Sequence, residues 1–510
     1  MRRLFPTIIR RPSIALASGA LSILGYAPFH IYPAVIIALA VFFYHLQSAG
    51  TSKQAAWTGF AFGLGFFCVG VSWIYVSLHV FGGMPWWMAG CATFSFCAFL
   101  AVFTAAMGWL SFNTGKILIA APVFWVLFEW IRSWIFTGFP WLNVGYSQIP
   151  YGPLAGFAPV LGVYGVSLFV AFAASLLVLM CYKVHRKRAL LAFIVVWIAG
   201  SVLKKTEWSA PFGEPLSVAL VQGNISQDIK WESSVIQATL DQYLAMALLS
   251  KARLIVLPET ALPVLTDDIP SAYLQRLKTH AIHNGGDILI GAVESDKGYY
   301  NSMLSVGNAV IGQPQFYRKS HLVPFGEYIP LKSVFGWIYR DWLNMPLTDL
   351  ARGSIKQQPL QLAGQQVAVN ICYEDVFGEE IIRQLPQATL LVNASNDAWY
   401  GRSLAAFQHL QMSQARALET GRMMLRATNT GDTAIIDTHG YVLQQLPHFT
   451  KATLESTAQG YTGITPYVRW GNAPAIAFIF ISIVFLWWNK LNRLTMPASF
   501  TKLSQRRKKK

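Results

Sequence analysis

Long apolar stretches recur through the first two fifths of the chain, and they decide what it can fold into. Up to residue 206 the only acidic residue is Glu129. The apolar stretches there approach the ~20 residues that a helix needs to cross hydrocarbon. Over the whole chain 54% of residues are hydrophobic and 13% are charged, unlike an average soluble domain. The sequence therefore predicts an integral membrane protein.

We expect about eight crossings and three regions. Residues 1–205 form a membrane domain with about seven helices, 206–470 form a polar globular domain, and 471–510 hold the last helix and a basic tail. The expected crossings are 12–27, 31–47, 56–79, 85–110, 117–136, 154–182, 189–203 and 474–488.

The basic residues predict the orientation. An even number of crossings puts both termini on one side, and most basic clusters fall on that side, which the positive-inside rule makes cytoplasmic. The 206–470 domain then faces outward. The net charge of +16 does not indicate nucleic-acid binding, because the charges flank apolar segments instead of covering one polar face. The main clusters are Arg2, Arg3, Arg10, Arg11, Lys183, Arg186, Lys187, Arg188 and 506–510.

The outward region alternates strand-like and helix-like patterns, which predicts an α/β domain. Helical periodicity covers 233–249, 271–283 and 404–425. The expected strands are 217–222, 254–257, 288–292, 303–306, 367–371, 389–392 and 433–437.

Three polar residues follow apolar runs in this region. Glu259 comes after Leu-Ile-Val-Leu-Pro, Lys319 lies in Tyr-Arg-Lys-Ser-His, and Cys372 ends the 367–371 strand. Because the carboxyl ends of strands in an α/β sheet converge on one crevice, we expect these side chains to meet. Cys372 is the only cysteine outside the apolar segments, so it has no disulfide partner in its own domain.

A carboxylate, an amine and a thiol together suit acyl transfer. A thiol needs a base or a cation to become a strong nucleophile. Glu259 can take its proton, and Lys319 can favour the thiolate and stabilise the oxyanion of the attacked carbonyl. Each residue alone also has an ordinary structural explanation: Cys372 as a small buried side chain, Glu259 as a helix cap, and Lys319 as a solvated surface charge.

The surrounding motifs resemble those of the nitrilase, or carbon-nitrogen hydrolase, superfamily, and more narrowly the bacterial apolipoprotein N-acyltransferases. The resemblance implies a multi-pass helical membrane domain that carries a nitrilase-like αββα sandwich. It also implies Glu259 as general base, Lys319 as oxyanion stabiliser and Cys372 as nucleophile. The matching stretches are Leu-Pro-Glu-Thr-Ala-Leu-Pro (257–263), Arg-Lys-Ser-His-Leu-Val-Pro-Phe-Gly-Glu (318–327), Ile-Cys-Tyr-Glu (371–374), Thr-Gly-Phe-Pro-Trp (137–141) and Ser-Asn-Asp-Ala-Trp-Tyr-Gly (395–401).

The reaction implied by this resemblance has two steps in the periplasm. An acyl chain leaves a phospholipid, typically phosphatidylethanolamine, for Cys372, and then passes to the α-amine of diacylglyceryl-cysteine in an apolipoprotein. No cofactor or metal is implied, and His280 and His283 lack the spacing of a zinc site. The resemblance assigns supporting or substrate-binding roles to Glu327, Tyr373, Glu374, Trp399 and Trp231.

Two further features point to lipid or to structure. The 331–343 stretch carries Trp337 and Trp342 among other apolar residues, a composition typical of the headgroup boundary. We expect it to be a lipid-contacting arm, although a helix packed on its own domain fits equally well. Glu129 and Arg132 share a helix face inside apolar sequence, and we interpret them as a structural ion pair.

Two other functions remain open at this stage. A membrane-anchored amide hydrolase would use the same three residues with water as acceptor, and it would release fatty acid or ammonia. A non-catalytic carrier of lipids or lipoproteins would keep the fold without needing the thiol.

Overall fold

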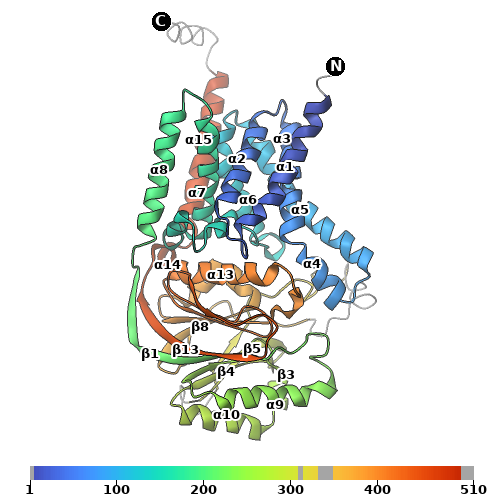
Figure 1. Cartoon of the computed structure of the whole chain (residues 1–510), viewed down its shortest axis with the longest axis vertical. Helices are drawn as coiled ribbons and strands as arrows, with labels where there is room; N and C mark the ends of the chain where they lie inside the picture. The colour runs from blue at the N-terminus through green and yellow to red at the C-terminus, as the bar shows by residue number, and fades with distance from the viewer. Residues whose placement is uncertain (1–4, 308–313, 331–332, 334–348, 496–510) are drawn as a thin grey trace.

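The computed structural model describes residues 5–307, 314–330, 333 and 349–495. A bundle of apolar helices forms one end of the molecule and two β-sheets form the other (Figure 1). The first and last helices both point away from the sheets at their outer ends. The long bundle helices are α1 (Phe5–Leu21), α2 (Pro33–Gln47), α3 (Ser52–Gly70), α5 (Trp86–Asn113), α6 (Ile117–Arg132), α7 (Ala158–Met180), α8 (Arg186–Leu203) and α15 (Ala473–Thr495).

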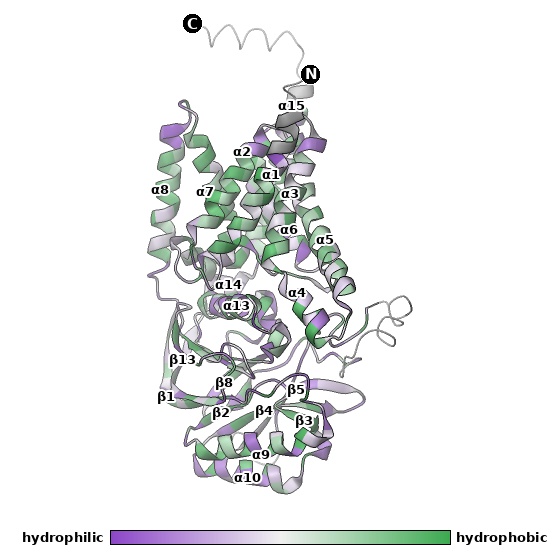
Figure 2. Ribbon diagram, turned by 45° about the vertical axis from the view of Figure 1, so that its right-hand side comes forward, coloured by the Kyte–Doolittle hydropathy of each residue, from purple (hydrophilic) through white to green (hydrophobic). Residues whose placement is uncertain are grey.

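The outer surface of this bundle is apolar. Large side chains such as Phe94 on α5, Val195 on α8 and Ile481 on α15 are more than half exposed, which hydrocarbon accommodates and water does not. Figure 2 shows the bundle as mostly hydrophobic, whereas the helices beyond the sheets carry hydrophilic stretches.

Length and apolarity qualify three helical stretches in the described residues as membrane spans: Trp86–Asn113, Pro153–Met180 and Ala473–Asn492. A fourth qualifies if Ser52–Gly70 and Trp73–Phe81, which meet at a bend of 48°, count as one span. These criteria do not confirm the expected number of about eight crossings. Several other bundle helices are shorter, as α2 is with 15 residues.

Two mixed sheets stack face to face. The first has the order β13-β1-β2-β4-β5-β6, with β3 paired to β4, and the second has the order β12-β11-β10-β9-β8-β7. The strands of the first sheet are β1 (Ser209–Gln222), β2 (Leu254–Val256), β3 (Leu262–Leu265), β4 (Asp287–Ser295), β5 (Tyr299–Gly307), β6 (Phe316–Arg318) and β13 (Ala452–Gly463). Those of the second are β7 (Leu360–Leu362), β8 (Gln365–Ile371), β9 (Leu390–Ser395), β10 (Met424–Thr428), β11 (Ala434–Ile436) and β12 (Val442–Gln445).

Alternation of side chains along the strands builds three apolar layers. Val218 and Leu220 of β1 meet Val367 and Val369 of β8 between the sheets. Neighbouring β1 residues face the other way, toward α9 (Ser233–Leu249) and α10 (Ser271–His283). On the far side, the second sheet packs against α13 (Ala405–Thr420). The order of layers is therefore α, β, β, α, as the family resemblance implied.

Helix α13 lies between the second sheet and the bundle (Figure 1). Its side chains are buried along almost the whole helix. Toward the bundle, Gln408 accepts a hydrogen bond from Trp141 Nε1 at 2.7 Å and donates to the carbonyl oxygen of Gly70 at 3.2 Å. Glu419 accepts one from the backbone N–H of Val163 at 2.8 Å. Helix α13 therefore contributes side chains both to the core of the second sheet and to the core of the helical bundle.

The helix expected over 404–425 is too long at its end. It stops at Thr420, because Gly421 adopts a left-handed conformation with φ of 63°, a common helix terminator. Residues Met424–Thr428 then form β10, a central strand of the second sheet. The apolar residues of 422–428 alternate between the core that lies between the sheets and the core beneath α13. An apolar run that is buried on both sides resembles the continuation of a buried helix.

Candidate active site

Glu259 and Lys319 meet at one edge of the first sheet. Strand β6 runs in the same direction as β2, since β2 and β4 are parallel and two antiparallel pairings follow. Glu259 and Lys319 both lie just beyond the carboxyl ends of their strands. Lys319 Nζ lies 3.3 Å from Glu259 Oε1 and 2.9 Å from Glu327 Oε1. The ammonium group is thus held between two carboxylates.

Lys319 is 1% exposed. Burial alone lowers the pKa of its ammonium group, but the nearby carboxylates of Glu327 and Glu259 more than compensate and raise the pKa above the ordinary value. The side chain therefore keeps its charge. An ammonium has three N–H donors. Two of them bond to the carboxylates of Glu259 and Glu327, so the third N–H remains available.

Cys372 directly follows β8 and is 8% exposed. Its backbone has φ of 51°, a left-handed conformation that costs a non-glycine residue free energy and often marks functional sites. Burial raises the pKa of the thiol well above its ordinary value, Glu259 raises it further, and Lys319 lowers it only in part. The resting sulfur is therefore a thiol, so its proton has to leave as the sulfur attacks.

Glu374 connects the segments that carry Lys319 and Cys372. Its carboxylate accepts five hydrogen bonds, at 2.7 to 3.1 Å, from groups on both segments. All five donors are neutral groups. These are Tyr317 Oη, the Ser320 backbone and hydroxyl, and the backbone N–H groups of His321 and Ile371. The carboxylate fixes one loop against the other.

Tyr373 links the site to the bundle. Its hydroxyl donates to the carbonyl oxygen of Gly138 at 3.1 Å, and its ring stacks on Trp141 with centroids 6.4 Å apart. Arg132 holds the same loop by donating to the carbonyl oxygens of Phe139 and Trp141 at 2.7 and 2.6 Å. The expected direct ion pair with Glu129 does not form among the described residues. Arg132 donates instead to Asn143 Oδ1 at 2.8 Å, and Glu129 accepts hydrogen bonds from Trp125 Nε1 and the Val144 backbone N–H. Arg132 therefore fixes the loop on which Tyr373 rests.

Replacing Arg132 by Met should destabilise the protein by about 3–5 kcal/mol, because buried oxygens of Phe139, Trp141 and Asn143 would lose their charged donor. The 137–148 loop should also loosen and slow the reaction at Cys372. Thermal unfolding in detergent and an acylation assay measure the two effects. Glu129 is buried and interacts with Arg132 electrostatically without a direct contact, so adding Glu129→Gln to Arg132→Met should recover part of the stability but not the activity. Equal recovery of both would contradict the positioning role.

The remaining predicted residues lie in different places. Trp399 packs by the bundle, where its carbonyl oxygen accepts a hydrogen bond from Ser77 Oγ at 2.8 Å and its ring contacts Phe81. Trp231 is half-buried in the turn before α9. Trp337 and Trp342 of the expected arm lie outside the described residues.

Two polar residues at Glu259 escaped sequence reasoning. Asn301 Nδ2 donates to Glu259 Oε1 at 2.7 Å and to Glu327 Oε1 at 2.9 Å. The expected strand began at 303, so Asn301 was left out of it. Lys230 is 2% exposed, and its Nζ donates to Thr260 Oγ1 at 2.8 Å. Burial lowers the pKa of Lys230 to about 8, although Glu259 opposes this shift. In the sequence, the only indication that Lys230 belongs to the site was its position directly before Trp231.

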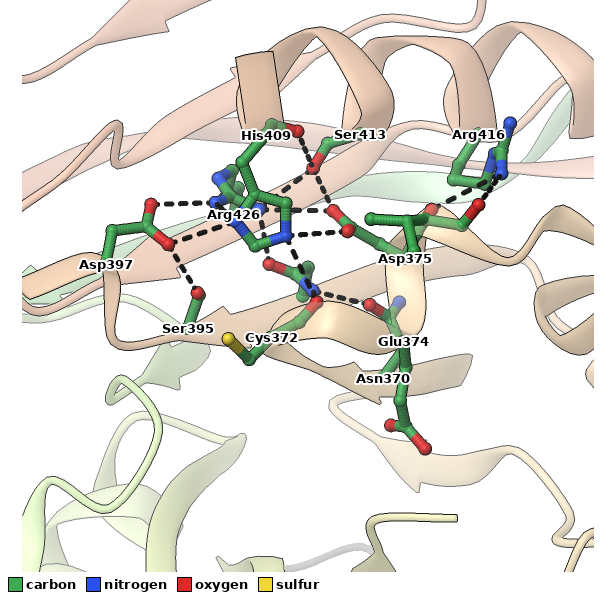
Figure 3. Close-up of polar contacts among 12 residues, drawn as sticks. Asn370, Cys372, Glu374, Asp375, Ser395, Asp397, His409, Ser413, Arg416 and Arg426 are labelled. Carbon is green, nitrogen blue, oxygen red and sulfur yellow. Dashed lines mark hydrogen bonds and ion pairs between the residues drawn. The ribbon is translucent and has the colours of Figure 1, made fainter. Parts of the chain in front are cut away.

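A buried charge network lies behind Cys372 (Figure 3). The carbonyl oxygen of Cys372 is 3.2 Å from both Asn393 Nδ2 and His409 Nε2. His409 also lies between two carboxylates, 2.8 Å from Asp375 Oδ1 and 3.0 Å from Asp397 Oδ1. Arg426 bridges the same two carboxylates at 3.1 and 2.8 Å. Sequence reasoning missed this network because its members come from four separate segments.

The two stacked sheets and the matching family model place the protein in the carbon-nitrogen hydrolase superfamily. Residues 217–466 match the family model described as carbon-nitrogen hydrolase, which covers both sheets except for the first part of β1. Residues 18–176 match the model described as apolipoprotein N-acyltransferase N-terminal domain, which falls on the helical bundle.

Relatives from bacteria narrow the class further. A protein of Nitrosomonas europaea named apolipoprotein N-acyltransferase is 54% identical, and the alignment covers 91% of this chain and 94% of the relative. A protein of the same name from Chromobacterium violaceum is 40% identical, with 93% of each chain covered. The chain therefore belongs to the apolipoprotein N-acyltransferase family.

Proposed function

We propose that this protein transfers an acyl chain from a membrane phospholipid to the N-terminal amine of diacylglyceryl-cysteine in apolipoproteins. The observation that carries the proposal is the buried pair of Glu259 and Lys319, 3.3 Å apart, whose charges both act on the buried Cys372 thiol in a domain that rests on an apolar helical bundle. Membership of the family supports the same reaction. No cofactor is required by this chemistry.

In the first half-reaction Glu259 takes the thiol proton while Cys372 Sγ attacks an ester carbonyl of the phospholipid. The third N–H of Lys319 and the backbone N–H of Tyr373 stabilise the oxyanion. As the C–O ester bond breaks, Glu259 returns the proton to the departing lysophospholipid oxygen. A thioester on Cys372 remains.

In the second half-reaction the α-amine of diacylglyceryl-cysteine attacks the thioester. Glu259 accepts the amine proton, an N-acyl bond forms, the C–S bond breaks, and Glu259 returns the proton to the Cys372 sulfur. Glu327, Tyr373 and Glu374 support the site through the contacts described above, and Trp399 and Trp231 are assigned to substrate binding or support by the resemblance. Both substrates react in turn at the same sulfur.

Eight membrane-spanning helices, with both termini in the cytoplasm, complete the proposal. Support comes from the eight long helices of the bundle, from the outer ends of α1 and α15 pointing the same way, and from the basic clusters at both termini. Residues 206–470 then face the periplasm of a bacterial inner membrane, with 1–205 and 471–510 as membrane regions. Phosphatidylethanolamine is the proposed donor, and Trp337 and Trp342 are the proposed lipid contacts.

Intact-mass measurement tests the reaction directly. Incubation of the purified protein with phosphatidylethanolamine should add one fatty-acyl mass, mapped to Cys372, and release lysophospholipid. Addition of a diacylglyceryl peptide should then remove the acyl group from Cys372, and the mass of the peptide should rise by the same amount. Discharge by water at the same rate without peptide would favour the amide-hydrolase alternative, and an unmodified Cys372 would favour a carrier.

A further inference from the structure

Ser395 lies beside the proposed nucleophile. Strands β8 and β9 are parallel, and their register pairs Asn370 with Asn393 and Ile371 with Ala394. The next residues along the two strands are Cys372 and Ser395. The Ser395 side chain is fully buried, and while burial raises the pKa of the Cys372 thiol, the Ser395 hydroxyl acts to lower it. Figure 3 shows the sulfur on the side of Cys372 that faces Ser395.

The Ser395 hydroxyl has a second partner. Its oxygen lies 2.8 Å from Asp397 Oδ1, to which it donates. A hydroxyl has one donor and two acceptor sites, so it can donate to only one of Asp397 and the sulfur at a time. While the sulfur carries its proton, the donor is free to stay with Asp397. Once Glu259 removes that proton, the sulfur is an anion that can only accept.

Asp397 does not need the serine proton. Arg426 Nη2 donates to its Oδ2 at 2.8 Å, and His409 Nδ1 lies 3.0 Å from its Oδ1. Burial alone raises the pKa of Asp397, but Arg426 and His409 outweigh burial and hold the pKa well below its ordinary value. Asp397 therefore stays ionised and fully partnered when the hydroxyl turns away.

His409 can keep its proton in this setting. Burial and Arg426, whose Nη2 lies 2.8 Å from His409 Nδ1, lower its pKa, but Asp375 and Asp397 outweigh them and raise the pKa to about 9. The rings of Trp141 and Tyr400 cover the imidazole at 5.7 and 6.2 Å between centroids. The charged network thus anchors one side of Ser395 at neutral pH.

We propose that Ser395 is a catalytic residue of the acylation step, whose hydroxyl turns from Asp397 to the sulfur as Glu259 takes the thiol proton. The serine keeps its own proton throughout and supplies only a hydrogen bond to the anionic sulfur. The S–C bond then forms and the ester C–O bond breaks as described above. The acylation part of this inference depends on the proposed function.

The test compares Ser395→Ala with the unaltered full-length protein in detergent. The first measurement is the pH dependence of iodoacetamide alkylation, read at Cys372 by peptide mass because four other cysteines are present. Loss of a hydrogen bond to a charged group should shift the alkylation midpoint to higher pH and slow acyl-enzyme formation by about 10- to 100-fold. Ser395→Thr, which retains the hydroxyl, should recover most of the rate.

Ser413→Ala is a matched control. Ser413 is a buried serine of the same network, and it contacts Arg426 and Asp375 instead of the sulfur. It should change thermal stability without moving the alkylation midpoint of Cys372. An equal shift in Ser413→Ala would overturn the proposal, because the effect would then come from disturbing the network.

An unchanged alkylation profile in Ser395→Ala, with an acylation rate within about twofold of the unaltered protein, would also overturn the proposed role of Ser395. If Ser395→Ala does not fold, Ser395→Cys, similar in size and a weaker donor, must shift the midpoint in the same direction. Alkylation needs no phospholipid. The role of Ser395 can therefore fail or succeed independently of the proposed acyl transfer.

Discussion

Replacing Cys372 by Ala should abolish acyl-enzyme formation and acyl transfer while the protein remains folded. The nucleophilic sulfur is lost, and no other cysteine lies in the 206–470 region. The side chain is small, so its removal from a site that is 8% exposed should cost about 1 kcal/mol. Intact mass after incubation with phospholipid gives the first readout, and thermal unfolding in detergent gives the second.

Cys372→Ser is the matched control for shape. A serine hydroxyl fills nearly the same space but ionises far less readily than a thiol, so the same base should not activate it enough. We expect both variants to lose transfer of acyl chains to a diacylglyceryl peptide. Undiminished lipoprotein acylation in cells that contain only Cys372→Ala would show that the protein is a carrier and that the thiol is dispensable.

Replacing Lys319 by Met should produce the second large effect, on stability and on acylation together. Glu259 and Glu327 would remain buried without the ammonium group that lies within 3.3 Å of both. Removal of one partner from a buried ion pair typically costs about 3–5 kcal/mol. Loss of an oxyanion donor typically lowers the rate by roughly 10²–10³. Thermal unfolding and the rate of acyl-enzyme formation measure these effects separately.

A double variant separates the two roles of Lys319. Adding Glu327→Gln removes one of the two uncompensated charges, while Asn301 remains available as a donor to that side chain. We expect Lys319→Met with Glu327→Gln to regain a good part of the thermal stability and none of the acylation rate. A return of acylation along with stability would mean that Lys319 acts only by holding the fold together.

The sequence predicted local structure best where one periodicity persisted. Helices α9 and α10 begin and end at the expected residues, Ser233–Leu249 and Ser271–His283. The strand after which Cys372 lies was also expected, because an apolar run ended abruptly at a polar cluster. Strand β10 was missed because its pattern continues that of α13, and only the conformation of Gly421 separates them.

The site was predictable only as a set of residue types. The motifs placed Glu259, Lys319 and Cys372 in one family pattern, and the fold brings Glu259 within reach of Lys319. Contacts between distant segments could not be predicted. Asn301 lies 42 residues from Glu259 in sequence, and Tyr373 reaches a carbonyl 235 residues away. No local periodicity encodes such distances.

Helix α13 limits how the chain can be divided. Its buried side chains meet the loops of the bundle on one face and the carboxylate network on the other. A fragment cut at residue 206 would leave Gln408 without its acceptor on Gly70 and Glu419 without its donor on Val163, and it would expose this face of α13 to water. A chimera that joins the bundle of one relative to the sheets of another would have to exchange both sides of the interface between α13 and the bundle. Residues on the two sides of this interface are therefore expected to vary together among relatives.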